Sequence, residues 1–289
     1  MSIAYVNGQY LPLRDATVSI EDRGYQFGDG VYEVIYVHNG RLIDAALHLA
    51  RLSRSLAEIE LGAPLATAAL PFVIQQLLRR NRISTGLIYI QVTRGVARRD
   101  HPFPSPSPRP SLVITARHRA APPQNIATWA ASAICLPDER WARCDIKSTN
   151  LLPNVLARHK ARLAGAYEAI LYDAENNVTE GAASSVWVVD AKGNLITRRL
   201  DAHILPGCTR AALITKLNER QIHFKEAAIP LAGLRAAREI FLTSASSFVK
   251  PITQLDGAPV GDGKPGPIAT RLLAHYIEHV NAAESLSHV

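Results

Sequence analysis

The chain has 289 residues, of which 47% are hydrophobic and 20% are charged. Such a chain can form one large domain or two ordinary ones, and its composition is that of a globular protein rather than a disordered one. The formal charge of +7 prompts a test for nucleic-acid binding. Its basic residues are scattered as singles and pairs, and no nucleic-acid-binding motif is present, so we expect no such partner.

The chain begins without the basic and apolar regions of a secretion signal, and no stretch approaches the ~20 apolar residues of a membrane span. Its three cysteines, Cys135, Cys144 and Cys208, lie far apart without CxxC spacing. An odd number of separated cysteines is typical of a reducing compartment and predicts neither a disulfide framework nor a metal site. We therefore expect a cytoplasmic protein with no membrane contact.

The first half of the chain predicts hairpins followed by two helices. Asn7-Gly8 and Asn39-Gly40 are strong signals for tight turns between strands. Apolar residues then recur at three- and four-residue spacing over 46–60 and 67–81, which predicts amphipathic helices. Two further strands are expected at 86–95 and 111–118, separated by a loop rich in proline and serine.

Residues 117–125 have the composition of a linker between domains. Beyond them, the chain alternates strands with helices, and no repeat of fixed period is found. We expect strands at 127–136, 167–173, 184–190 and 239–245, and helices at about 150–164, 209–219 and 266–284. The sequence therefore predicts an α+β fold of two mixed domains: a small N-terminal domain, 1–119, and a larger C-terminal domain, 120–289, carrying Lys147.

Lys147 lies just before the predicted helix at 150–164, which a polar residue after it can cap. Ile146 and Leu151 flank it and would reduce its solvation, favouring the neutral amine that attacks carbonyl groups. On this window alone, a solvated surface lysine is the commoner interpretation.

Glu180 enters a predicted buried strand, where a carboxylate needs a cationic partner. The protonated ring nitrogen of pyridoxal phosphate is one such partner, and a water-facing glutamate on an edge strand is an equally good interpretation. Cys208 and Thr209 begin a predicted helix, whose free N–H groups and positive end suit a phosphate. Arg51 can supply a forked phosphate contact, although most arginines on a helix face are simply solvated.

Gly28 and Gly30 precede a strand instead of joining a strand to a helix, and the third glycine of a dinucleotide fingerprint is missing. No phosphate-binding loop, H-E-x-x-H or G-x-S-x-G motif is present.

Taken in order, the motifs resemble those of class IV aminotransferases, and in particular the group specific for D-amino acids. They are EDRGYQFGDGVYEV, QVTRG followed by RxH, RWxRCDIKSxNLL, YEAIL, VTEG, LPGxTR and TSxxS. The resemblance spans nearly the whole chain, and so many ordered motifs are more specific than any one of them. It implies pyridoxal 5′-phosphate as cofactor, fold type IV, and a homodimer whose subunits complete each other's sites.

The resemblance also implies residue roles. Lys147 would hold the cofactor and move the substrate Cα proton, and Glu180 would pair with the ring nitrogen. The phosphate would be held by Arg51, Cys208, Thr209, Ser244 and Ala245, and the substrate carboxylate by Tyr32, Arg99 and His101. Ala245 stands where the family usually has a threonine, and Arg98 adds a charge beside Arg99.

The expected reaction transfers the amino group of a D-amino acid, such as D-alanine, to a 2-oxo acid, such as 2-oxoglutarate. The alternatives on the same fold are an L-branched-chain aminotransferase and an aminodeoxychorismate lyase. Arg99 and His101 favour the D-specific reaction. A basic module that binds nucleic acid is the alternative of a different class, and it predicts no bound chromophore.

Overall fold

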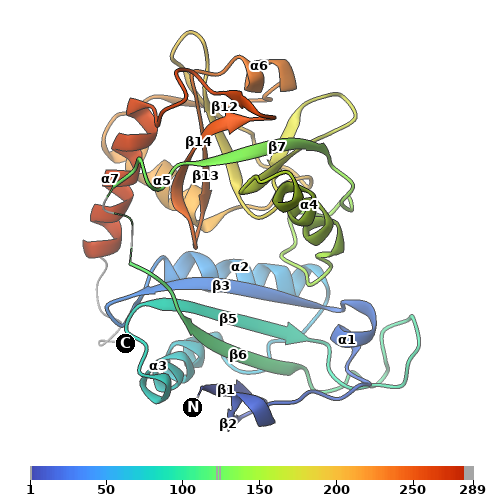
Figure 1. The fold of residues 1–289 in the computed structure, drawn as a ribbon. Coiled ribbons are helices and arrows are strands. Elements are labelled where there is room, and N and C mark those ends of the chain that lie inside the picture. Colours follow the sequence, from blue (N-terminus) through green and yellow to red (C-terminus); the bar gives the residue numbers. More distant parts are fainter. Residues whose placement is uncertain (1, 122, 124, 283–289) are drawn as a thin grey trace. The chain divides into compact units, whose positions relative to one another are not determined.

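The computed structural model describes residues 2–121, 123 and 125–282 (Figure 1). The described chain forms two compact units. Unit 1 comprises residues 2–121 together with Ile146–Asn150, and unit 2 comprises 123, 125–145 and Leu151–Ala282. No helix in these described ranges is both long and apolar enough to cross a membrane.

Unit 1 is built on a six-stranded antiparallel sheet with the order β2-β1-β6-β5-β3-β4. Asn7 and Gly8 both adopt positive φ, as do Asn39 and Gly40, so the two predicted tight turns are confirmed. The strands are β1 (Ile3–Val6), β2 (Gln9–Pro12), β3 (Gly30–His38), β4 (Arg41–Leu42), β5 (Gly86–Thr93) and β6 (Ser111–His118). The helices are η1 (Leu13–Asp15), α1 (Arg23–Phe27), α2 (Ala45–Glu58), η2 (Thr67–Ala69) and α3 (Leu70–Asn81).

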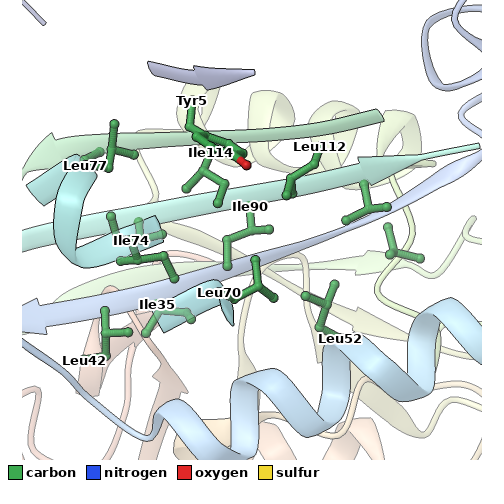
Figure 2. Packing of buried hydrophobic residues seen from close by; sticks show 14 of the residues in the cluster. Tyr5, Ile35, Leu42, Leu52, Leu70, Ile74, Leu77, Ile90, Leu112 and Ile114 are labelled. Carbon is green, nitrogen blue, oxygen red and sulfur yellow. The ribbon is translucent and has the colours of Figure 1, made fainter. Parts of the chain in front are cut away.

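The core of unit 1 lies on one face of this sheet. Alternate residues of a strand point to the same face, so the register that pairs Ile35 with Ile88 and Ile90 with Ile114 places all four together. Leu52 of α2 and Ile74 of α3 belong to the same buried cluster, whose members Figure 2 shows. The apolar spacing that predicts these helices is therefore the spacing of their buried faces.

The segment Ile146–Asn150 belongs to unit 1, and this corrects the expectation that the C-terminal domain carries Lys147. The backbone N–H of Tyr32 donates to the Lys147 carbonyl at 3.0 Å, and Ser148 forms a β-bridge with Val31. Ile146 is buried in the unit 1 core. This short segment is thus bound to β3, although the chain on both sides of it belongs to unit 2. A single boundary in the sequence therefore cannot divide the two units.

Unit 2 contains a nine-stranded sheet with the order β12-β11-β10-β13-β14-β7-β8-β9, with β15 paired to β14. Trp187 and Phe241 stack at its centre with ring centroids 5.8 Å apart. The strands are β7 (Ala131–Pro137), β8 (Glu168–Tyr172), β9 (Val178–Gly181), β10 (Ser185–Val189), β11 (Leu195–Thr197), β12 (Phe224–Glu226), β13 (Glu239–Ser244), β14 (Phe248–Leu255) and β15 (Ala258–Pro259). The helices are α4 (Leu152–Leu163), α5 (Cys208–Glu219), α6 (Leu231–Arg235) and α7 (Pro267–Ala282).

The α+β architecture of two mixed units is the one the sequence predicts. The strand expected at 127–136 begins only at Ala131, because the N–H groups of Trp129 and Ala130 both donate to the Ile126 carbonyl in a turn. Residues 283 and 284 of the last predicted helix lie outside the described residues, as do two residues of the predicted linker, 122 and 124.

Candidate active site

Lys147 is held at its main chain and lies over an aromatic ring. Besides the bond from Tyr32, its own N–H donates to the Ser55 hydroxyl of α2 at 3.3 Å. Its Nζ lies 4.2 Å from the centroid of the Tyr32 ring, which in turn lies 5.7 Å from the ring of Tyr89. Burial, with the nearby Tyr32, raises the pKa of Tyr89 to about 12. The Lys147 main chain is therefore held at both its N–H and its carbonyl, and its amine lies over the Tyr32 ring.

Arg51 is bound to a buried carboxylate. Its Nε and Nη2 donate to the two oxygens of Glu33 at 2.7 and 2.9 Å, and His48 Nδ1 lies 2.7 Å from Glu33 Oε2. Burial alone would raise the pKa of Glu33, but the hydrogen bonds from Arg51 and His48 outweigh it and lower the pKa to about 2. The ionised Glu33 fixes the plane of the Arg51 guanidinium.

Arg99 and His101 are exposed residues in the loop between β5 and β6. Both contact Phe27 of α1: the Arg99 guanidinium lies 5.0 Å from its ring centroid, and the His101 ring lies 5.6 Å from it. Tyr32 has its own contacts with Tyr89 and Lys147. The three residues expected to bind the substrate carboxylate thus appear in two places within unit 1: Tyr32 lies beside the lysine, and the two loop residues lie against Phe27 of α1.

Glu180 of β9 is buried and ion-paired. Its Oε1 accepts a hydrogen bond from Arg140 Nη1, and its Oε2 accepts the Leu205 N–H at 3.1 Å. Arg140 also binds Asp138 through Nε and Nη2. Although burial opposes the charged form, the bond to Asp138 and the negative charges of Glu180 and Asp138 raise the pKa of Arg140. β9 is the last strand in the sheet order, but Glu180 is buried, so its interpretation as a water-facing residue is wrong.

The start of α5 has the geometry expected of an anion site. Its N-cap is Gly207, which has no side chain to accept hydrogen bonds from the first turn, and Cys208 and Thr209 follow as buried residues. A Cβ atom on Gly207 would lie 2.7 Å from the Ser185 hydroxyl, so glycine permits this close approach to β10.

Ser244 and Ala245 form the tight turn between β13 and β14. Ser244 Oγ lies 2.6 Å from Ser247 Oγ and accepts the Ser247 N–H at 3.2 Å. Phe248, which ends the turn, has a φ of 56°, unusual for a bulky residue. The turn is compact and strained, features that are frequent at ligand-binding sites.

The chain matches the family model for class IV amino-transferases over residues 30–255. It is 42% identical over 279 residues to the D-alanine aminotransferase of Listeria monocytogenes serotype 1/2a (strain 10403S), covering 96% of each chain. It is 39% identical over 285 residues to the D-alanine aminotransferase of Staphylococcus haemolyticus, covering 99% of this chain and all of the other.

Solved structures agree with the fold. A T.th. branched-chain amino acid aminotransferase, solved with pyridoxamine 5′-phosphate, has a TM-score of 0.86 and 25% identity over 96% of this chain and 94% of that one. The Escherichia coli branched-chain amino acid aminotransferase has a TM-score of 0.87 at 23% identity, covering 99% and 97%. The chain belongs to the class IV aminotransferases. It is an enzyme, as the sequence motifs predict.

Sequence reasoning missed several residues that organise the site. Glu33 is an acid in a buried strand, the same signal that identified Glu180, and the alternation of its strand could have singled it out. Arg140 and His48 carry no such signal, because charged residues in a loop or on a helix face are usually solvated.

Proposed function

We propose that this enzyme transfers the amino group of a D-amino acid such as D-alanine to a 2-oxo acid such as 2-oxoglutarate. One contact supports it most directly: Lys147 Nζ, the expected catalytic amine, lies over the ring of Tyr32, the expected substrate-binding phenol. The relatives named D-alanine aminotransferase, similar over nearly their whole length, support the D-specific choice. Arg99 and His101, which we assign to the substrate carboxylate, favour it over the L-branched-chain and lyase alternatives.

Pyridoxal 5′-phosphate is the cofactor, and when bound it supplies an electron sink for charge that develops at the substrate Cα. We assign the buried carboxylate of Glu180 to the protonated ring nitrogen, with Arg140 and the Leu205 N–H holding that carboxylate in place. We assign the phosphate to Arg51, to Cys208 and Thr209 at the glycine-capped start of α5, and to the turn at Ser244 and Ala245.

Lys147 then has two tasks. Its amine would hold the cofactor covalently, and the same amine would take the substrate Cα proton and return it at the adjacent carbon. The Lys147 carbonyl accepts the Tyr32 N–H and the Lys147 N–H donates to Ser55 Oγ, so the main chain is held still while the side chain moves. Tyr32 orients the substrate so that one face meets the amine.

We also propose a homodimer in which Arg99 and His101 complete the partner's site. Both are exposed on the single chain. Ile20 and Tyr25, each more than 70% exposed, lie in the segment that bridges to the same loop through Asp22 and Val96. Exposed apolar side chains of this kind suit an interface.

The three cysteines are free, which supports the proposed cytoplasmic location.

The test replaces Arg99 by Ala and measures the Michaelis constant for D-alanine, with Arg109→Ala in the same loop as control. We expect a rise of about 10-fold or more for Arg99→Ala and little change for Arg109→Ala, because Arg99 provides a charge-assisted contact. An unchanged constant in Arg99→Ala would count against the carboxylate assignment. Greater activity with L-leucine than with D-alanine would move the enzyme to the branched-chain group.

A further inference from the structure

Asp29, between α1 and β3, is shared by two buried arginines. Its Oδ2 accepts hydrogen bonds from the Nε atoms of Arg23 and Arg94, both at 2.8 Å. The side chains of Arg23 and Arg94 are only 4% and 3% exposed, and that of Asp29 is 10% exposed. Burying two guanidinium groups against one carboxylate is costly unless their remaining donors are also satisfied.

Those donors bind main-chain carbonyls. Arg23 Nη1 donates to the Asp100 carbonyl at 2.5 Å, and its Nη2 donates to the His101 carbonyl at 3.2 Å. Arg23 thus binds the main chain of the loop at Asp100 and His101, the two residues that follow Arg99.

The second arginine anchors the same loop from another direction. Arg94 donates to the carbonyls of Glu60 and Ile59, and its guanidinium lies 3.6 Å from the centroid of the Phe103 ring. The Phe27 ring contacts the side chains of Arg23, Arg99 and His101. Every second residue of this part of the loop therefore contacts a buried-arginine or aromatic neighbour. Arg99 and His101 contact Phe27, and Phe103 contacts Arg94.

We propose that Asp29, Arg23 and Arg94 are positioning residues, which hold the loop so that Arg99 and His101 present the geometry needed to bind a substrate carboxylate. This inference rests on the proposed function. The forked guanidinium suits the task, because Nε can bind Asp29 while the two terminal nitrogens bind successive carbonyls. A lysine at position 23 keeps the charge but cannot make all three bonds.

An irregular loop of this length would otherwise sample many conformations, and ordering it at each binding event would weaken binding. The contacts from Arg23 and Arg94 order the loop when the protein folds, so substrate binding does not have to order it. Small displacements of substrate-binding groups reduce catalytic efficiency strongly, so the anchors act on binding although they need not touch substrate.

The experiment compares wild type, Arg23→Lys, Phe27→Leu, Arg99→Ala and the control Arg109→Lys, all as enzyme loaded with pyridoxal phosphate. It measures kcat and KM for D-alanine, hydrogen exchange of peptides covering residues 97–104, and the visible absorption of the bound cofactor. We expect KM in Arg23→Lys to rise about 10- to 100-fold with kcat nearly unchanged, the pattern of lost substrate binding. Exchange at 97–104 should become faster while cofactor absorption stays at the wild-type level.

Phe27→Leu tests the same support without removing a buried charge, and it should show a smaller rise in KM of the same kind. An unchanged KM in both Arg23→Lys and Phe27→Leu, when Arg99→Ala raises it, would overturn this inference and leave the proposed function intact. Loss of cofactor absorption with an unchanged KM in the remaining active enzyme would show a merely structural role and would also overturn it. Failure of wild type to use D-alanine would overturn the proposed function itself.

Discussion

Arg140 donates from Nη1 to Oε1 of Glu180 inside unit 2, where both side chains are less than 10% exposed. The carboxylate expected to face the cofactor ring is therefore already balanced by one protein cation. Its second oxygen accepts the Leu205 N–H. The Glu180 side chain is thus fixed at both oxygens.

Replacing Arg140 by Gln should destabilise the protein by about 3–5 kcal/mol, because it leaves the carboxylates of Glu180 and Asp138 without their buried partner. Denaturant unfolding measures this. Arg143→Gln is the control, since its pair with Asp145 is 43% exposed on the arginine side and should contribute about 1 kcal/mol at most. Equal losses in the two variants would contradict the buried role of Arg140.

The ionisation of Glu33 should make the free energy of unfolding depend on pH in the acid range. Its pKa of about 2 in the folded protein lies below the ordinary 4.5, so its contribution is fully present above pH 4.5 and is lost as the pH falls toward 2. The difference in unfolding free energy between wild type and Glu33→Gln should therefore shrink across that range. A constant difference between pH 5 and pH 2.5 would show that the Glu33 carboxylate is not preferentially ionised in the folded state.

Gly30→Ala should disturb the strand that binds the lysine segment. A Cβ atom there would lie 2.6 Å from the Val92 carbonyl, and the Gly30 carbonyl accepts the Thr149 N–H at 3.0 Å. We expect a cost of about 1–3 kcal/mol, as for other overpacked sites, together with reduced kcat. Gly62→Ala is the matched control, because a Cβ atom there would have no neighbour within 4 Å. A Gly30→Ala protein with the same melting temperature and kcat as wild type would contradict this prediction.

Local signals in the sequence predicted most of the fold. The Asn-Gly turns and the apolar spacing of α2 and α3 depend on neighbouring residues, and they appear where expected. The attachment of Ile146–Asn150 to unit 1 was missed, since it depends on main-chain bonds between Tyr32 and Lys147, 115 positions apart in the chain. No local pattern encodes such pairing.

The candidate site divides in the same way. Motifs single out Lys147 and Glu180 as candidates, and Glu180 is buried beside a cation, Arg140, as the sequence argument requires. Arg140 and Asp29 were not found, because their importance comes from what they contact. Their residue types at those positions look like ordinary surface charges.

The most direct test of the central claim is the visible absorption spectrum of the protein loaded with pyridoxal phosphate, recorded for wild type and Lys147→Ala before and after adding D-alanine or L-leucine. Wild type should show the band of lysine-bound cofactor and lose it with D-alanine but not with L-leucine, and Lys147→Ala should lack that band. A wild-type band that responds only to L-leucine, or a Lys147→Ala protein that behaves like wild type, would contradict a D-amino-acid aminotransferase acting through Lys147.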